Sequence, residues 1–410
     1  MPDRADVVVV GAGLAGLAAA TVVADGGHSV AVLEASDDVG GRVRTDEVDG
    51  FLVDRGFQVL LTAYPELDRQ LDRAALRLQA FDPGAMVRIG DRFHVVGDPL
   101  RRPGSLLSTV AAPVGTPVDK LRLLALRRRL RSSTVPQLLR GQDVDTAEAL
   151  REEQFGPNLV ERFLRPLIGG IQLDPELTTS RRMFDTIFRT LSEGDAAVPA
   201  VGMGAIPRQM AARLDPGWVH LEHPALRVEP GRVTLPGNKG ISADRIIVAT
   251  EGPAASDLLG LRPVASRAAT CVWFAAERPP TDSKLIVLDG TGAGPALNVA
   301  VMSNVAPEYA PVGSALIAAA CPGVVDAEVE PAVRRQLHGW WGSQVGGWRH
   351  LRTHTIPHGQ PDQRPPFSPK QRVALGDGLF VCGDQRDTAS IQGALFSGRR
   401  CGEAVVASLT

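Results

Sequence analysis

The chain has 410 residues, of which 44% are hydrophobic and 22% are charged. This composition is typical of a globular protein, and the length exceeds what one hydrophobic core organises, so we expect two or three domains. The formal net charge of −2 excludes a general attraction to nucleic acid, and no run of about 18 apolar residues predicts a membrane span.

The N-terminal stretch predicts a nucleotide-binding unit. Residues 6–10 contain four consecutive valines and predict a buried parallel strand. A glycine-rich turn follows, then a helix over 17–25, then an apolar strand over 29–33 that ends at Glu34. The turn residues are Gly11, Ala12, Gly13, Leu14, Ala15 and Gly16. This order is typical of a dinucleotide site, and we reject a turn without ligand because every part of the pattern is present.

Each residue type has a physical role in such a site. Gly11 permits a sharp turn, Gly13 leaves room for a pyrophosphate at the backbone, and Gly16 lets the helix pack close to the strand. The helix N-terminus offers free N–H groups to the phosphates. Glu34 would accept hydrogen bonds from a ribose and repel a 2′-phosphate, so we expect FAD or NAD rather than NADP.

The next segment, 38–45, favours FAD through a resemblance. Its run Gly40-Gly41-Arg42 resembles that of the flavin-containing amine oxidase and phytoene desaturase superfamily, whose arginine approaches the FAD phosphates. The resemblance implies FAD contacts at Ala35 and along this run. It also implies an α/β fold with a discontinuous Rossmann-like FAD-binding domain of the two-part glutathione-reductase/amine-oxidase type. An inserted substrate domain of mixed sheet and helices (α+β) completes that fold.

The resemblance continues into the segment that follows. Residues 48–54 predict a hairpin. The residues that the resemblance then places near the flavin are Gly56, Phe57 and Gln58. Gln58 is either a hydrogen-bonding partner of flavin or substrate, or an ordinary loop amide.

A second domain follows. A short helix is expected from Tyr64, and alternating residues over 81–97 predict two strands that depart from the βαβ pattern. Helices are expected over 145–163 and 180–191 as the helical part of the substrate domain.

The helix over 120–131 is leucine-rich and strongly basic. It is either a helix lying on an anionic membrane at the mouth of a substrate tunnel, or a scaffold helix with one packed leucine face and a solvated arginine face. We favour the scaffold helix, because the net charge gives no wider membrane signal.

The middle of the chain alternates between the two domains. Residues 201–207 resemble the family's return into the FAD domain, and the resemblance places the backbone of Val228 against the adenine. Strands are expected over 218–221, 226–228, 233–235, 241–250, 270–275 and 284–289. The glycine-rich run 290–295 is interpreted as a hairpin loop. A helix over 331–342 and a proline-rich loop over 357–369 follow.

The C-terminal residues complete the predicted FAD site. A strand ends in Gly383 and Asp384, and the helix after it begins near Ile391 and Gln392. In the resembled family this aspartate binds the ribityl or pyrophosphate region, and the helix N-terminus faces the flavin. The predicted FAD-binding domain is 1–80, 200–262 and 368–410, and the predicted substrate domain is 81–199 and 263–367.

Departures from the family refine the functional prediction. The strand position where amine oxidases carry a lysine corresponds to Thr270, and the position of their cage tyrosine holds Ser390. No cysteine for covalent flavin attachment occurs in 354–369. We therefore expect non-covalent FAD and a desaturase-like FAD-dependent oxidoreductase that takes hydride from an apolar organic substrate of the small-molecule class, with a bulky substrate favoured over a small amine. No catalytic residue is assigned; His358 and Gln58 are candidates by loop position only.

Three alternatives remain open. One is a flavin monoamine or polyamine oxidase with unusual site residues. A second is a non-catalytic escort-type protein that shares the fold, and a third is flavin-dependent sugar-ring isomerisation. The four cysteines are far apart in sequence, so we expect buried thiols, no metal site and a cytoplasmic protein. The sequence leaves the oligomeric state open.

Overall fold

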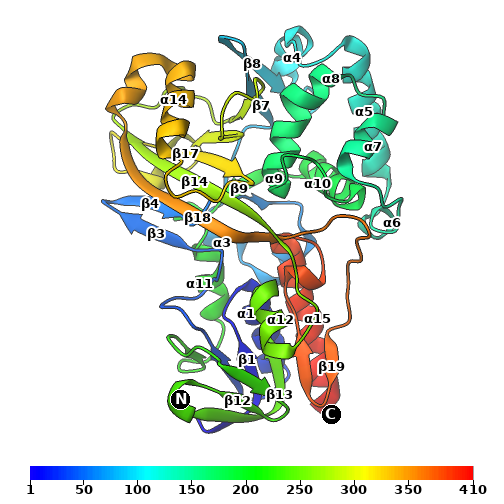
Figure 1. The fold of residues 1–410 in the computed structure, drawn as a ribbon, viewed down its shortest axis with the longest axis vertical. Coiled ribbons are helices and arrows are strands. Elements are labelled where there is room, and N and C mark those ends of the chain that lie inside the picture. Colours follow the sequence, from blue (N-terminus) through cyan, green and yellow to red (C-terminus); the bar gives the residue numbers. More distant parts are fainter. Residues whose placement is uncertain (410) are drawn as a thin grey trace.

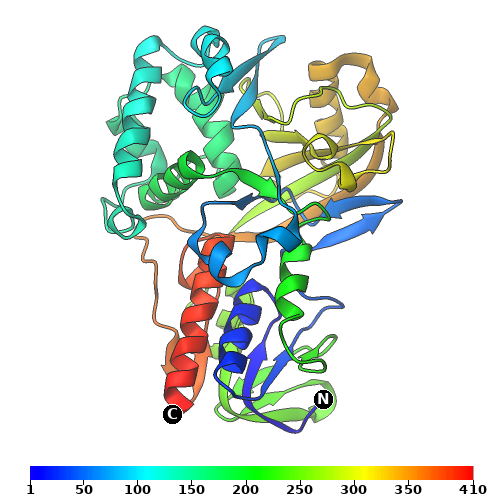
Figure 2. The same cartoon turned by 180° about the vertical axis from the view of Figure 1, so that it is seen from behind.

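Two lobes stacked along the long axis make up the molecule (Figures 1 and 2). The computed structural model describes residues 1–409. The lobe that carries both termini is built on an eight-stranded sheet, and the other lobe combines a seven-stranded sheet with a group of helices. This mixed architecture confirms the predicted fold class.

The sheet of the terminal lobe is parallel at its centre. β1 (Arg4–Val10) pairs in parallel with β2 (Val30–Leu33) on one side and with β13 (Gly240–Val248) on the other. The valines of β1 are buried on both faces of the sheet, which explains the continuous apolar run. The other strands of this sheet are β10 (Val219–His220), β11 (Arg227–Glu229), β12 (Arg232–Thr234), β19 (Ala374–Gly376) and β20 (Leu379–Val381).

Helices α1 (Leu14–Asp25) and α15 (Ile391–Leu409) lie side by side against this sheet (Figures 1 and 2). Their close approach requires glycine, because a Cβ at Gly398 would lie 2.2 Å from the backbone oxygen of Ala15. A Cβ at Gly16 would lie 1.9 Å from the backbone oxygen of Gly11, so α1 can start close to β1 only with glycine there. Helix α12 (Gly252–Leu259) packs into a second apolar cluster of the same sheet.

The second sheet belongs to the other lobe and is mostly antiparallel, with one parallel pair. Its strands, in spatial order, are β18 (Arg349–Pro361), β14 (Ser266–Ala276), β17 (Ala315–Pro322), β16 (Asn298–Val301), β15 (Ile286–Asp289), β7 (Gly84–Ile89) and β8 (Arg92–Gly97). The hairpin predicted at 290–295 is confirmed, because β15 and β16 pair in antiparallel fashion. The proline-rich loop predicted from Pro357 is wrong up to Pro361. Those residues end β18, where proline is tolerated because β18 is an edge strand.

The helical group stands beside this sheet and contains the predicted helices. Its members are α4 (Leu106–Ala111), α5 (Pro117–Ser132), α6 (Val135–Leu138), α7 (Thr146–Glu152), α8 (Pro157–Leu159), the π-helical segment Val160–Gly169, α9 (Gly170–Gln172) and α10 (Arg181–Glu193). Pro166 lies inside the π-helical segment, and the side-chain amide of Asn298 donates to its carbonyl at 2.8 Å. The second sheet is thus hydrogen-bonded directly to the π-helical segment.

Smaller elements join the lobes or cover their faces. They are β3 (Thr45–Val48), β4 (Phe51–Asp54), β5 (Leu60–Leu61), β6 (Gln79–Ala80), β9 (Ala196–Val198), α2 (Pro65–Gln70), α3 (Arg73–Leu76), α11 (Ala205–Ala211), α13 (Met302–Val305) and α14 (Glu330–Trp341). The hairpin predicted over 48–54 is confirmed as β3 and β4, and the short helix predicted from Tyr64 as α2. Within residues 1–409, no helix combines the length and apolar character of a bilayer-spanning segment.

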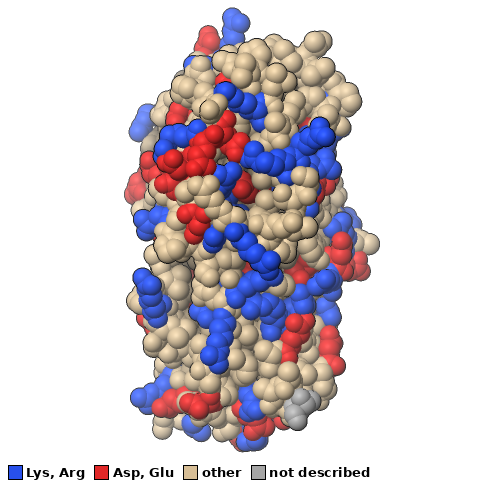
Figure 3. Space-filling model, turned by 90° about the vertical axis from the view of Figure 1, so that its right-hand side faces the viewer, with Lys and Arg blue, Asp and Glu red and all other residues tan. Residues whose placement is uncertain are grey.

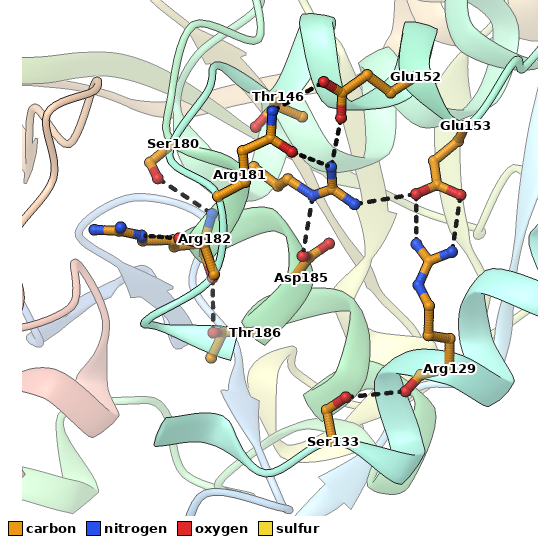
Figure 4. Close-up of polar contacts among 12 residues, drawn as sticks. Arg129, Ser133, Thr146, Glu152, Glu153, Ser180, Arg181, Arg182, Asp185 and Thr186 are labelled. Carbon is orange, nitrogen blue, oxygen red and sulfur yellow. Dashed lines mark hydrogen bonds and ion pairs between the residues drawn. The ribbon is translucent and has the colours of Figure 1, made fainter. Parts of the chain in front are cut away.

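An ion-pair network joins three helices of the helical group (Figure 4). Arg181 of α10 contacts Glu152 at 2.6 Å, Glu153 at 3.1 Å and Asp185 at 3.3 Å. Glu153 also pairs with Arg129 of α5. Burial raises the pKa of Asp185, and the Arg181 guanidinium only partly offsets this effect. Arg181 therefore contacts three carboxylates in a partly buried position and shares one of them, Glu153, with Arg129.

Replacing Arg181 with glutamine is expected to lower the free energy of unfolding by about 2–4 kcal/mol, because it leaves the buried carboxylate of Asp185 without its paired cation. Urea unfolding followed by circular dichroism measures this loss. The matched control is Arg151→Gln, whose exposed pair with Glu148 contributes less than about 1 kcal/mol. Equal losses in the two variants would contradict the assignment of the network.

Asp54, at the end of β4, is fully buried. It accepts hydrogen bonds from Tyr309 Oη at 2.8 Å, Thr45 Oγ1 at 2.5 Å and the backbone N–H of Met203 at 3.0 Å. Burial nevertheless raises its pKa from 3.8 to about 6. The folded chain consequently holds the Asp54 proton more tightly than the unfolded chain does between these two pH values.

The contribution of Asp54 to stability is expected to be complete below pH 3.8 and to be lost as the pH rises through 6. The loss amounts to at most about 3 kcal/mol. We expect the difference in free energy of unfolding between Asp54→Asn and the unaltered chain to change by this amount across the window. Chemical denaturation at a series of pH values measures the difference, and a flat difference would show that Asp54 does not titrate there.

Candidate functional site

A cavity of about 1180 Å³ contacts both lobes. Most of the residues assigned to FAD binding from sequence line it. They are Gly11, Gly13, Leu14, Ala15, Glu34, Ala35, Gly40, Gly41, Arg42, Gly56, Phe57, Gln58, Gly383, Asp384 and Ile391. These residues come from the beginning and the end of the chain, and the terminal lobe brings them to one wall.

Four assigned residues lie outside the lining: Ala12, Gly16, Val228 and Gln392. Ala12 donates its backbone N–H to Glu34 Oε2 at 2.8 Å, and Gln392 Oε1 accepts from the backbone N–H of Glu66 at 3.0 Å. Val228 is buried in the sheet core, and Pro224 and Ala225 line the cavity instead. The roles of these four residues in cofactor binding stay predictions.

Glu34 is buried at the cavity wall and held by its own chain. One carboxylate oxygen accepts from the backbone N–H of Ala12, and the other accepts from the backbone N–H of Ser36 at 2.9 Å and from its hydroxyl at 2.7 Å. A carboxylate offers about four acceptor positions, so this arrangement fixes the side chain and leaves capacity for a ribose hydroxyl.

Arg42 and Asp384, the two charged residues assigned to the phosphate and ribityl regions, contact each other. Arg42 Nη2 lies 2.7 Å from Asp384 Oδ1, and Nη1 donates to the carbonyl of Gly359 at 2.6 Å. Burial lowers the pKa of Arg42, but Asp384 outweighs this effect and the net shift is upward. Arg42 is a permanent cation with further N–H groups free to bind a phosphate.

The wall fits a flavin nucleotide. A Cβ at Gly13 would meet no atom within 4 Å, so the backbone there is open to a ligand. The Gln58 Nε2 group donates to the carbonyls of Arg42 and Arg55, while its buried Oε1 has no partner among residues 1–409. An unpaired buried acceptor beside a cavity is satisfied when a ligand donor occupies it. This favours the flavin-contacting interpretation of Gln58.

The far part of the cavity is an apolar chamber within the helical group. Its walls are Val114, Leu123, Leu124, Leu159, Phe163, Leu167, Ile171, Ile187, Phe188 and Leu191. These side chains project from α5, α8, α9, α10, the π-helical segment and the loop before α5. The tryptophans Trp273, Trp340 and Trp341 are not among the lining residues, and Trp273 and Trp340 are buried in the core.

Several residues at the cavity escaped sequence reasoning. Tyr64 lines the cavity and shares a hydrogen bond with Ser390, and burial raises its pKa well above the usual range. The phenol of Tyr64 therefore lies beside Ser390, the position that corresponds to the cage tyrosine of amine oxidases. The chain has only two tyrosines, and this rarity was the one sequence feature that could have drawn attention to Tyr64.

Charged groups also reach the chamber. Lys120 donates to the carbonyls of Val110 at 2.7 Å and Ala112 at 2.8 Å, and burial lowers its pKa. Arg127 pairs with Asp98 at 2.6 Å. The mouth of an apolar chamber thus carries fixed cations.

His358, Thr270 and the nearby His354 differ in their positions relative to the cavity. His354 lines the cavity 3.3 Å from Asp46, and its pKa is lowered because burial outweighs that carboxylate. His358, a loop candidate from sequence, is outside the lining and contacts Ser266 Oγ at 3.0 Å. Thr270 lines the cavity, and its hydroxyl donates to the Val324 carbonyl at 2.9 Å.

No cluster of three or more His, Cys, Asp or Glu side chains within residues 1–409 has an arrangement that would hold a metal ion. The four cysteines are all buried with free thiols, as expected. Cys271 lines the cavity, and burial raises the pKa of its thiol well above the usual range.

The proteins similar to this chain include both porphyrinogen oxidases and amine oxidases. The coproporphyrinogen III oxidase of Propionibacterium freudenreichii subsp. freudenreichii is 33% identical over 172 residues, which cover 40% of this chain and 31% of that protein. The matched segment therefore spans about a third of that relative. A candidate protoporphyrinogen oxidase from Exiguobacterium sp. 255-15 shares the fold, with a TM-score of 0.75, 19% identity and full coverage of both chains. Cyclohexylamine oxidase from Brevibacterium oxydans IH-35A gives a TM-score of 0.72 and 17% identity, also with full coverage of both chains.

One family of known proteins matches nearly the whole chain. The family described as flavin containing amine oxidoreductase matches residues 14–406, nearly the entire chain. The matched span runs from the start of α1 to near the end of α15; it includes Glu34, Arg42 and Asp384 of the predicted FAD wall and begins just after Gly11 and Gly13. The chain belongs to the family of flavin-containing amine oxidoreductases.

Proposed function

We propose that the protein is an FAD-dependent oxidoreductase that takes hydride from a bulky, apolar organic donor and holds its FAD non-covalently. The observation that carries the proposal is the continuity of this cavity, which runs from the glycine-rich wall into the apolar chamber. Its volume of about 1180 Å³ exceeds the roughly 300–1000 Å³ typical of a site for one small molecule. The cavity therefore has room for a cofactor and a donor together.

The chain's own residues would bind and orient both ligands. Glu34 and Arg42 would hold the ribose and phosphates, and Gln58 would pair its free acceptor with the cofactor or donor. FAD, when bound, supplies the two-electron acceptor. The apolar walls position the donor by burial, at about 25 cal/mol per Å², and exclude water. Cys271 is kept as an unreactive thiol by its burial, which supports non-covalent attachment.

The donor class follows from the relatives' names together with the chamber. The Propionibacterium and Exiguobacterium proteins are both described as porphyrinogen oxidases. A hydroporphyrin is bulky and largely apolar, as the chamber requires, and its acidic side chains would suit the cations at the mouth. We therefore choose a hydroporphyrin as the first donor to test and a polyene as the second.

Anaerobic stopped-flow reduction of the bound flavin tests the proposal. We expect bleaching by a hydroporphyrin or a polyene to be at least about a hundredfold faster than by benzylamine or a polyamine, because loose positioning costs about that factor. Acid or heat should release the flavin from the protein. A purified protein without flavin absorbance would support the escort-type alternative, and flavin retained after acid denaturation would contradict non-covalent binding.

An amine oxidase is the second candidate, and Tyr64 favours it. The side chain comes from the N-terminus of α2, faces the cavity and is tied to Ser390. Together with Phe57 and Phe81, whose rings meet edge to face at 6.2 Å, it supplies an aromatic wall. Fast bleaching by an amine, with none by the apolar donors, would make this the better assignment.

A further inference from the structure

We propose that the faces of α4 and α5 around the cavity mouth dock on an anionic lipid surface. The first observation is the distribution of exposed apolar side chains. Seven of the twelve large hydrophobic side chains exposed among residues 1–409 fall within 100–124. They are Leu100, Leu106, Leu107, Val110, Val118, Leu121 and Leu124, and we call this set the apolar lip. Clustered exposed apolar residues mark an interaction surface rather than random exposure.

Helix α5 has the packed leucine face that the sequence favoured, but it also carries leucines outside that face. Leu126 and Leu130 pack into the core, as a scaffold helix requires, but Leu121 is 66% exposed and Leu124 44% exposed. Val118, Leu121 and Leu124 repeat at helical spacing, so they form one stripe that points away from the protein. Leu107 of α4 is 82% exposed. Lys120 bonds the last carbonyls near α4, which keeps the two helices together.

The apolar lip is continuous with the cavity. Leu106, Val110 and Leu124 are exposed to solvent and also line the cavity. A lipid surface pressed against these helices would therefore meet the chamber's mouth directly. An apolar donor dissolved in that lipid could then enter without crossing water.

The charges near the apolar lip indicate that the lipid surface is anionic. Residues 100–132 contain eight basic residues and one acidic residue, whereas the whole chain has a formal charge of −2. The stripe that begins with Val118 and Leu121 continues into Arg128 and Arg131, which pair with no carboxylate among residues 1–409. In Figure 3 the upper right of the surface is mainly tan, and basic side chains lie beneath it. Arg129, by contrast, is held by Glu153 within the network of Figure 4.

This combination fits an anionic membrane better than a second copy of the chain. A symmetric dimer through the apolar lip would bring Arg128 and Arg131, which pair with no carboxylate among residues 1–409, close to their own copies, whereas Arg101, Arg102, Arg127 and Arg129 are already paired. Repulsion between the unpaired arginines disfavours that contact. An anionic bilayer offers apolar tails to the leucines and negative headgroups to the arginines. The proposal does not depend on the identity of the donor, because lipid binding is measured without one.

Co-sedimentation of the flavin-loaded protein with lipid vesicles tests the proposal. We expect binding to vesicles containing about one third phosphatidylglycerol, and much weaker binding to pure phosphatidylcholine. Binding should fall when salt is raised from about 0.1 M to about 1 M, where screening shortens from about 10 Å to about 3 Å. Absence of binding to the anionic vesicles at low salt, or equal binding to neutral ones, would overturn the proposal.

Variants distinguish lipid binding through the apolar lip from nonspecific binding through other exposed residues. Leu107→Ser/Leu121→Ser should weaken partitioning at least about tenfold, because two exposed leucines lose their burial in lipid. The matched control, Val312→Ser/Val325→Ser, changes two exposed valines elsewhere and should leave binding unchanged. Arg128→Glu/Arg131→Glu should likewise weaken binding at least about tenfold, whereas Arg278→Glu/Arg335→Glu should not.

Equal effects of the lip and control variants would overturn the proposal. So would a dimer, measured by light scattering, that dissociates only in Leu107→Ser/Leu121→Ser. All of these variants change exposed side chains, so folding is expected to survive. Unchanged thermal unfolding and flavin content in each variant confirm that lipid binding alone is being compared.

Discussion

The variant Gly13→Val is expected to fold and to lose its flavin. The structure leaves an open space beside Gly13, since a Cβ there meets no atom within 4 Å, and the backbone has φ of −72°, which any residue adopts. The cost to the fold should be about 1 kcal/mol or less, as for a weaker helix N-cap. The added methyl groups would occupy the space through which the backbone reaches the pyrophosphate.

We expect flavin affinity to fall at least about a hundredfold, because blocking this approach removes more than one charge-assisted hydrogen bond, each contributing about 1.5–3 kcal/mol. Flavin absorbance per chain after purification and titration with FAD measure the loss. Gly346→Val is the matched control, since its glycine is exposed, is not a cavity residue and also has open space beside it. Normal flavin binding by Gly13→Val would refute the assignment of the turn.

The terminal lobe was predictable because its signals are local. Strand β1, the glycine turn and Glu34 follow one another within 34 residues. Each of these residue types occurs at its position for one dominant physical reason. The π-helical segment could not be foreseen in the same way. It depends on Asn298, a residue of the other sheet more than a hundred positions away, which satisfies the carbonyl of Pro166.

The substrate chamber was less predictable because side-chain orientation decides it. From sequence, the leucines of α5 are equivalent, but the structure sends Leu126 into the core, Leu123 to the cavity and Leu121 to solvent. Tyr64 illustrates the same limit: its helix was expected, but its contact with Ser390 joins residues at opposite ends of the chain. Pairings between distant segments leave no periodic signal in one sequence.

Leu123→Trp is expected to block oxidation of bulky donors while leaving the flavin in place. Leu123 lines the apolar chamber from α5 and lies away from the glycine-rich wall. The indole would fill chamber volume, so a bulky donor would be displaced by an ångström or more from its reacting position. A displacement of that size costs about a hundredfold in rate, and we expect at least this loss in the rate of flavin reduction.

Leu121→Trp supplies the matched control, two residues away on the same helix, because its side chain points to solvent. Flavin content and reduction by dithionite should be unchanged in both variants, which separates donor seating from cofactor binding. Stopped-flow reduction with a hydroporphyrin and with a small amine gives the decisive comparison. A loss confined to the hydroporphyrin in Leu123→Trp places the donor in the chamber. Equal rates in Leu123→Trp and Leu121→Trp would show that the donor binds elsewhere and that the chamber does not select it.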